Sequence, residues 1–359
     1  MKRIVLLGDG IGLPRLLRHV PPGLAAAVVA AANRPQGHEA LAALAAERNL
    51  PFLIQPRRNA PEYPAFIPAL RDLRADFLLC DSYSMLLPEE AFGLFRRAVN
   101  LHGGKLPEYR GANVLQWAMI NGEREAGLTL HDMTAEADAG PVIASMNVPI
   151  LLRDDWLDLR DRLGRAAENL WTHILPELLA GRGAGRPQKG MPRVWPRRGP
   201  EDGHVDIVWP VMKIYNAIRA LIPPLSGAFL EAPDGRRRIF ERRLSLVETA
   251  ALKADTYPFL YGGLRLEPHD PAGTSGAVPP ESILENISDL ALNIFDPAAS
   301  AAMAHPPAGA ELFFSPDGAT LRAEFTCAAG AEERVRRCLA NFCAAELGDP
   351  VLTLEQKTK

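Results

Sequence analysis

The sequence predicts an α/β fold whose N-terminal half forms a Rossmann-like, mostly parallel sheet. Short apolar runs alternate with helix-length segments from residue 3 to residue 102, a rhythm typical of βαβ units. The run DFLLCDSY at residues 76–83 is almost entirely apolar at its centre, as expected of a strand covered on both faces. Parallel sheets of this kind bind ligands at the carboxyl ends of their strands.

The apolar runs and the helical spacing give an ordered set of elements. We expect strands at residues 3–8, 25–33, 51–56, 76–83 and 97–102, with helices between them at residues 12–20, 37–50, 63–75 and 88–95. A hairpin-like section of residues 127–133 and 142–150 follows, and a helix at residues 156–179 closes this unit.

The length of 359 residues predicts more than one domain. We expect a first domain at residues 1–182 and a Gly-, Pro- and Arg-rich linker at residues 183–203. A small mixed, β-rich subdomain at residues 204–250 and an accessory α+β region at residues 251–359 complete the chain. The accessory region contains a predicted hairpin at residues 310–325, with its turn at Pro316-Asp317-Gly318, and a helix at residues 332–347.

The composition argues against several classes of protein. The formal net charge is −3, which predicts no basic surface for nucleic acid. No apolar stretch approaches the roughly 20 residues of a membrane span. The four cysteines form no Cys-x-x-Cys or Cys/His cluster, so we expect no structural metal and no disulfide framework, and a cytoplasmic location.

The stretch GDGIGLP at residues 8–14 resembles a dinucleotide-binding turn at first sight. It departs from G-x-G-x-x-G because Leu13 and Pro14 stand where the pattern needs Gly and a helix former. No acidic residue closes the next strand, which ends in Asn33. The stretch is therefore interpreted as a tight strand-to-helix turn.

The strand at residues 97–102 ends in Asn100-Leu101-His102, followed by Gly103-Gly104. Residues two apart in a strand face the same side, so the Asn100 amide and the His102 imidazole are expected to project together. An amide can donate to a developing oxyanion, and an imidazole can exchange a proton near neutral pH. The two glycines are expected to let a ligand or another chain segment approach closely.

Two loops supply the other candidate residues. Asp138, in the loop of residues 134–141, provides a carboxylate, which beside an imidazole would orient the ring and raise its pKa. The loop Met85-Leu86-Leu87-Pro88 follows the most apolar strand and offers an apolar face to a flat heteroaromatic ligand.

Together these motifs resemble the folate-dependent formyltransferases. The resemblance rests on Asn100-Leu101-His102 and on the stretches LPEYRG (106–111), QWAMINGEREAGLTLHDM (116–133) and ADAGPVIA (137–144), and it covers roughly residues 1–179. The details look most like the branch that formylates a UDP-linked 4-amino-4-deoxyarabinose. Residues 196–206 and 214–229 resemble the small C-terminal subdomain of that branch, which leaves the region after about residue 248 without a counterpart.

The resemblance implies a 10-formyltetrahydrofolate-dependent N-formyltransferase with a formyltransferase fold and no metal. Asn100, His102 and Asp138 match the family's catalytic residues. The pterin of the folate would lie against two loops, through Met85, Leu86, Leu87, Pro88, Ala135, Ala137, Gly140 and Pro141. The family's S-L-L-P loop appears here as Gly104-Lys105-Leu106-Pro107, a departure that concerns the acceptor rather than the reaction.

The acceptor side stays open at this point. A nucleotide-linked amino sugar is the first expectation, with Lys105, Tyr109 and Arg110 as substrate-binding residues and Arg110 facing phosphate. A non-sugar amine such as a hydroxyornithine, a peptide or an antibiotic intermediate is an alternative. Methionyl-tRNA formylation and hydrolysis of the folate to formate are further alternatives. A homodimer is compatible with the sequence.

Overall fold

The computed structural model describes residues 2–232 and 235–244, the backbone of strands at 265–268, 310–314, 320–325 and 351–356, and a few single residues between 249 and 340. The chain divides into two compact units. The first contains residues 1–115, 126–148 and 160–197, and the second contains residues 116–125, 149–159 and 198–359.

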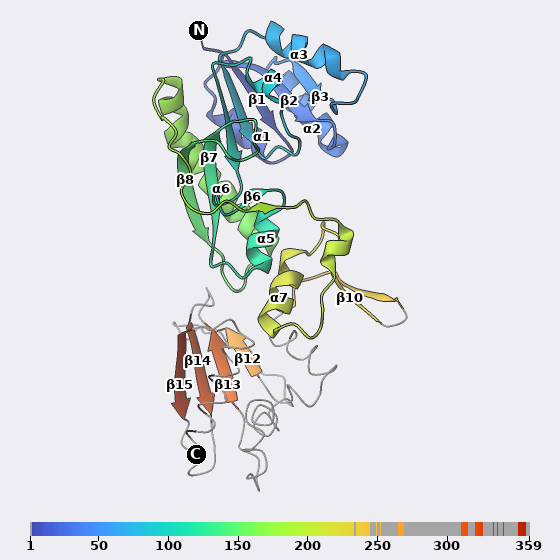
Figure 1. Cartoon of the computed structure of the whole chain (residues 1–359), viewed down its shortest axis with the longest axis vertical. Coiled ribbons are helices and arrows are strands. Elements are labelled where there is room, and N and C mark those ends of the chain that lie inside the picture. The colour runs from blue at the N-terminus through green and yellow to red at the C-terminus, as the bar shows by residue number, and fades with distance from the viewer. Residues whose placement is uncertain are drawn as a thin grey trace. The chain divides into compact units, whose positions relative to one another are not determined.

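A seven-stranded sheet forms the centre of the first unit, in the order β3-β2-β1-β4-β5-β7-β8 (Figure 1). Its strands are β1 (Ile4–Gly8), β2 (Ala25–Ala31), β3 (Phe52–Gln55), β4 (Phe77–Asp81), β5 (Arg97–His102), β7 (Glu125–Asp132) and β8 (Val142–Pro149). The pairs from β3 to β5 are parallel, and β5 pairs with β7 antiparallel. The predicted α/β fold with a mostly parallel sheet is therefore confirmed.

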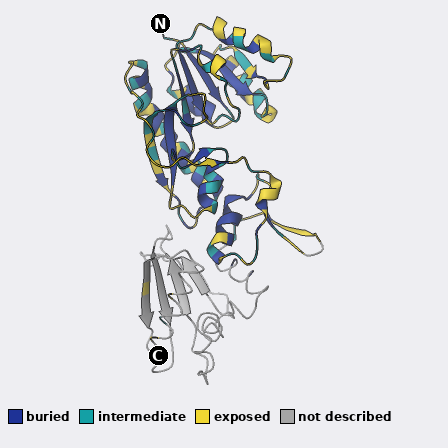
Figure 2. Cartoon of the chain, viewed as in Figure 1, coloured by how far each residue is buried: buried dark blue, intermediate teal, exposed yellow. Residues whose placement is uncertain are grey.

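Helices follow the strands as expected from the alternating sequence. They are α1 (Gly12–His19), α2 (His38–Glu47), α3 (Tyr63–Asp72), α4 (Glu89–Phe92), α5 (Val114–Ile120) and α6 (Trp156–Leu179), with a 3₁₀ turn at Pro35–Gly37. Strands β1 and β4 are buried at every position (Figure 2), as both faces of a doubly covered parallel sheet must be. On one face, Val5, Leu7, Leu78 and Cys80 pack with Phe66 and Leu70 of α3.

A buried polar cluster fixes the carboxyl end of β4. The Asp81 carboxylate accepts hydrogen bonds from the Trp171 indole at 2.9 Å and from the Arg15 guanidinium at 3.4 Å. A side chain at Gly12 would collide with the carbonyl of Asp81, so the glycine permits this close approach. The first glycine-rich stretch is thus a tight strand-to-helix turn, as its sequence indicates.

The segment after α6 differs from an exposed linker. It contains β9 (Val194–Trp195), which pairs in parallel with β6 (Arg110–Gly111). The Trp195 side chain is buried, and its indole stacks on the Tyr109 ring with the ring centroids 5.4 Å apart. Gly and Pro are so frequent in this segment that its composition does not reveal the attachment of Trp195 to the first unit.

In the second unit, an arginine of one helix donates hydrogen bonds to backbone carbonyls of a loop. The unit includes a 3₁₀ turn (Pro200–Gly203), α7 (Val211–Ala220), and the antiparallel pair β10 (Ala228–Glu231) and β11 (Arg237–Phe240). Arg219 of α7 is buried, and its Nη1 donates to the carbonyls of Leu151 and Asp154. An arginine in a helix is usually solvated, but Arg219 supports the backbone of this loop instead.

Four strands of the second unit form a separate sheet in the order β12 (Arg265–Pro268), β13 (Ala310–Phe314), β14 (Thr320–Phe325) and β15 (Val351–Gln356). Strands β13 and β14 pair antiparallel, as the predicted hairpin requires. The turn at Pro316-Asp317-Gly318, and Cys338 and Cys343 in the predicted helix at residues 332–347, lie outside the described residues.

Candidate active site

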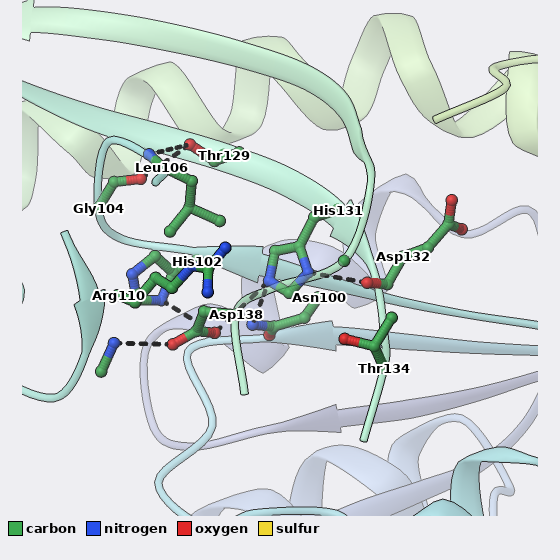
Figure 3. Close-up of polar contacts among 12 residues, drawn as sticks. Asn100, His102, Gly104, Leu106, Arg110, Thr129, His131, Asp132, Thr134 and Asp138 are labelled. Atoms are coloured by element: carbon green, nitrogen blue, oxygen red, sulfur yellow. Dashed lines mark hydrogen bonds and ion pairs between the residues drawn. The ribbon is translucent and has the colours of Figure 1, made fainter. Parts of the chain in front are cut away.

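The antiparallel pairing of β5 with β7 gathers four polar side chains on one face of the sheet. Asn100 stands opposite His131, and His102 stands opposite Thr129. Because side chains alternate along each strand, the two cross-strand pairs face the same side. Figure 3 shows Asn100, His102 and His131 around Asp138, which comes from the loop after β7.

Both nitrogens of the His102 imidazole face oxygen atoms. Its Nε2 lies 2.6 Å from the carbonyl oxygen of Tyr109, and its Nδ1 lies 3.5 Å from Oδ1 of Asp138. A carbonyl oxygen only accepts hydrogen bonds, so Nε2 carries the proton in the neutral ring. Nδ1 is therefore the atom at which His102 can take up a proton, and Asp138 faces that atom.

The glycines after His102 have different surroundings. A Cβ at Gly104 would lie 2.6 Å from Nε2 of His102 and would collide with the Tyr109 carbonyl, whereas a Cβ at Gly103 would meet nothing within 4 Å. Gly104 thus leaves room for the hydrogen bond that orients His102. The close approach predicted at the two glycines occurs at Gly104, where the approaching group is the Tyr109 carbonyl of the same chain.

The Asp138 carboxylate faces three nitrogen atoms. Oδ1 is 3.5 Å from His102 Nδ1 and 3.5 Å from His131 Nε2, and Oδ2 accepts the Gly111 N–H at 2.9 Å. Burial raises the pKa of this carboxyl, but the contacts with His131, His102 and Gly111 outweigh burial and lower the pKa to about 2. Asp138 therefore stays ionised at neutral pH.

Burial lowers the pKa of His102 below its ordinary value, and the nearby His131 acts in the same direction. Asp138 and the Tyr109 carbonyl raise it, but they do not outweigh burial. Asp138 thus raises the pKa of His102 as expected, but the net pKa is lowered, because sequence spacing does not reveal how deeply the ring is buried. His102 is neutral at pH 7 and available as a base.

His131 orients the Asn100 amide. The Nδ1–H of His131 donates to the carbonyl oxygen of Asp132 at 2.9 Å, which leaves Nε2 as an acceptor. Nδ2 of Asn100 lies 3.2 Å from this Nε2. One N–H of the amide is directed to His131, and the second remains for another acceptor.

The backbone of the first predicted folate loop, residues 85–88, is held by a hydrogen bond. Gln55 Nε2 donates to the Leu86 carbonyl at 2.9 Å, while the Leu86 side chain is 78% exposed. Leu87 packs on the cluster that contains Cys80, which is the register partner of Asn100. Met85, Leu87 and Pro88 are partly buried. The first loop thus borders the face of the sheet on which Asn100 lies.

In the second loop, Ala135 and Ala137 are exposed, Gly140 is buried and Pro141 is partly buried. A Cβ at Gly140 would collide with the Asp132 carbonyl. The loop therefore folds back tightly on the end of β7, and this brings Asp138 to the two histidines. Contact of either loop with a folate stays a prediction.

The three predicted acceptor contacts differ in exposure. Lys105 is exposed, whereas Tyr109 and Arg110 are buried. Arg110 donates from Nη1 to Glu136 at 2.8 Å and from Nη2 to Gln188 at 2.8 Å. Their role in binding an acceptor stays a prediction.

Sequence reasoning missed three residues of this site, namely Thr129, His131 and Gln188. Thr129 donates to the Gly104 carbonyl at 2.8 Å and so fixes the turn after His102. The two-residue spacing of Thr129 and His131 in GLTLHDM is the same signal that identified Asn100 and His102. Gln188 has no comparable signal, because it lies in the Gly- and Pro-rich segment.

Two features are absent from the described part of the chain. No group of three or more His, Cys, Asp or Glu residues there is arranged to hold a metal ion. Within the same residues, no helix combines the length and the apolar character needed to cross a membrane.

Comparison with known proteins gives a family match and a set of similar folds. The formyl transferase family model matches residues 19–175. A sugar N-formyltransferase from Shewanella sp. FDAARGOS_354 is 15% identical, with a TM-score of 0.57 over 68% of this chain and 98% of the other. A 4-N formyltransferase from Francisella tularensis is 14% identical, with a TM-score of 0.56 and the same coverage.

A third structure was solved with ligands. It is an N-formyltransferase from Helicobacter canadensis in complex with folinic acid and dTDP-3-aminofucose, 18% identical, with a TM-score of 0.50 over 61% of this chain and 80% of the other. At these identities the solved structures show the fold, and the family model shows the domain. The chain is a formyl-transferring enzyme whose residues 19–175 are a formyl transferase domain with the fold of the sugar N-formyltransferases.

Proposed function

We propose that the chain transfers a formyl group from 10-formyltetrahydrofolate to the primary amine of a nucleotide-linked amino sugar, with Asn100, His102 and Asp138 as the catalytic residues. The observation that carries the proposal is the convergence of an amide, a neutral imidazole and an ionised carboxylate at the ends of β5 and β7. Acyl transfer to an amine needs an oxyanion donor, a base and a group that stabilises the protonated base.

The reaction follows from the atoms at the site. The unprotonated amine attacks the formyl carbon, a C–N bond forms, and the carbonyl oxygen becomes an oxyanion. The second N–H of Asn100 Nδ2 donates to that oxygen. His102 takes the amine's proton at Nδ1, and Asp138 stabilises the resulting imidazolium. The bond from the formyl carbon to the folate nitrogen then breaks, and the proton on His102 can pass to that nitrogen.

The donor side has support from the first loop. The backbone of residues 84–86 is fixed by hydrogen bonds from Asn33 and Arg197 to the Ser84 carbonyl and from Gln55 to the Leu86 carbonyl. A large apolar side chain that stays 78% exposed on so fixed a loop suits contact with a flat ligand. The Helicobacter canadensis relative, solved with folinic acid, supports a folate in this fold.

The acceptor side rests on Lys105. Its side chain is exposed in the turn that follows His102, and its backbone packs against Gly127, where a Cβ would lie 2.7 Å from the Lys105 Cα. The turn is thus fixed while the ammonium group is accessible to a phosphate. The dTDP-3-aminofucose in the Helicobacter canadensis structure supports a nucleotide-linked acceptor.

The test incubates the purified full chain with 10-formyltetrahydrofolate and a panel of UDP- and dTDP-linked 3-amino and 4-amino sugars. Mass spectrometry detects the formylated sugar, and absorbance follows the release of tetrahydrofolate. His102→Ala should abolish most turnover, while His173→Ala, an exposed position on α6, serves as the control. Absence of product from every nucleotide-linked sugar would overturn the acceptor class. Formate released without any amine would indicate hydrolysis instead.

A further inference from the structure

Gln188 bridges the loop that carries Asp138, although fifty residues separate the two positions in the sequence. Its Nε2 donates to the carbonyl of Asp138 at 2.7 Å and to the carbonyl of Gly140 at 2.9 Å. Both hydrogens of the amide are used on the backbone of a single tight loop. The side chain therefore ties together two carbonyls of the Asp138 loop.

Arg110 fixes the orientation of the Gln188 amide. Oε1 of Gln188 accepts from Nη2 of Arg110 at 2.8 Å and from Nε at 3.2 Å. A guanidinium only donates, so the amide oxygen must face Arg110 and the amide nitrogen must face the loop. Arg110 is itself buried, and its Nη1 donates to Glu136 of the same loop at 2.8 Å.

A second anchor lies a few residues further along the same segment. Residues 186–195, here called the strap, include β9, whose Trp195 pairs with Gly111 of β6. Gly111 has a φ of +96°, and a Cβ there would collide with the Trp195 carbonyl. The N–H of Gly111 donates to Oδ2 of Asp138 at 2.9 Å. The strap thus supports the carboxylate as well as the backbone of Asp138.

Asp138 needs such support because its position is unfavourable by itself. Its φ of +55° lies in the left-handed region, which is unfavourable for a residue other than glycine. Its contacts with the two imidazoles are 3.5 Å long, so a small displacement of the loop would break them.

We infer that Gln188 is a positioning residue that, with the rest of the strap, holds Asp138 against His102 and His131. This inference rests on the proposed function, because positioning matters only if Asp138 takes part in the reaction. It also assigns a role to a segment whose composition is typical of a linker.

Three variants test the inference kinetically. Gln188→Ala removes all four hydrogen bonds of the side chain. Gln188→Glu keeps the shape and the contact with Arg110 but directs a carboxylate oxygen at two carbonyls. Met191→Ala, at an 85% exposed position of the same strap, is the control. We expect both Gln188 variants to lower kcat by up to about a hundredfold with KM unchanged, and Met191→Ala to match wild type.

The titration of His102 gives a readout that needs no substrate. Asp138, His131 and the Tyr109 carbonyl are the groups that face its ring. Since Asp138 raises the pKa of His102, withdrawal of the loop should lower that pKa further in Gln188→Ala. NMR of a histidine-labelled full chain measures it, and thermal unfolding shows whether the fold is kept. If Gln188→Ala fails to fold, Gln188→Glu takes its place in both measurements.

The outcomes separate this inference from the proposed function. An active wild type whose folded Gln188 variants keep kcat and the pKa of His102 overturns the inference alone. A wild type that formylates no amine overturns the proposed function, and the titration then decides the positioning role by itself. A lower pKa of His102 in the folded variants supports the role, and an unchanged pKa overturns it.

Discussion

Nε2 of His131 lies 3.2 Å from the amide nitrogen of Asn100, across the antiparallel pair of β5 and β7. The hydrogen bond between them determines which way the amide faces. An amide free to rotate would present its oxygen as often as its nitrogen to a developing oxyanion. His131 therefore acts on the reaction through Asn100.

Replacement of His131 tests this relationship. His131→Ala should lower kcat, but by less than Asn100→Ala, which removes an oxyanion donor worth about a hundredfold or more. In the double variant, the loss should be smaller than the product of the two single losses, because His131 then has no amide to orient. Steady-state kinetics of the four proteins completes the cycle. Independent, multiplying losses would contradict the assignment.

The burial of His102 predicts the acid side of the pH profile. His102 must be neutral to take the amine's proton, and burial lowers its pKa below the ordinary value of about 6.5. Activity should therefore persist below pH 6.5 and fall only as the pH drops through the lowered pKa and His102 becomes protonated. The measurement is kcat against pH at saturating substrate. An acid limb above about pH 6.5 would speak against His102 as the base.

The two glycines after His102 predict opposite results for the same substitution. Gly104→Ala would place a methyl group against His102 Nε2 and the Tyr109 carbonyl, so it should destabilise the fold by about 1–3 kcal/mol and lower kcat. Gly103→Ala meets open space and should leave the free energy of unfolding unchanged. Urea unfolding of both variants provides the comparison, and equal stabilities would refute this account of Gly104.

The buried Asp81 cluster predicts a stability effect away from the reacting atoms. Asp81→Ala leaves the buried Arg15 guanidinium and the Trp171 indole without the carboxylate that they share. Removing one partner of a buried ion pair costs about 3–5 kcal/mol. The double variant Asp81→Leu/Arg15→Leu should lose less, since it leaves no unpaired buried charge. Chemical unfolding measures both, and a larger loss in the double variant would be inconsistent with the pairing.

The sequence was sufficient for the features that depend on local periodicity. Alternation along β5 correctly placed Asn100 and His102 on one face, and the apolar runs indicated the strands of a mostly parallel sheet. Thr129 and His131 are likewise two residues apart in β7, so the same alternation places them on one face. Their significance appears only once β7 is known to pair antiparallel with β5, because that register sets His131 opposite Asn100.

Other features depend on long-range packing and leave no local signal. The lowered pKa of His102 results from its burial, and the spacing of Asn100, His102 and Asp138 in the sequence does not indicate how deeply the ring is buried. Gln188 and Trp195 lie among glycines and prolines, whose abundance is typical of a linker. A buried aromatic residue, a side-chain amide and several backbone hydrogen bonds attach that segment, and none of them alters its composition.

The strap also bears on where the first unit can be cut. A fragment ending near residue 182, at the predicted domain boundary, would retain every strand of the large sheet and all of α6. It would lack Gln188 and the partner strand of Gly111. Such a fragment would lack the Gln188 bridge across the Asp138 loop, so an isolated catalytic half designed for crystallisation or inhibitor screening needs to extend to about residue 197.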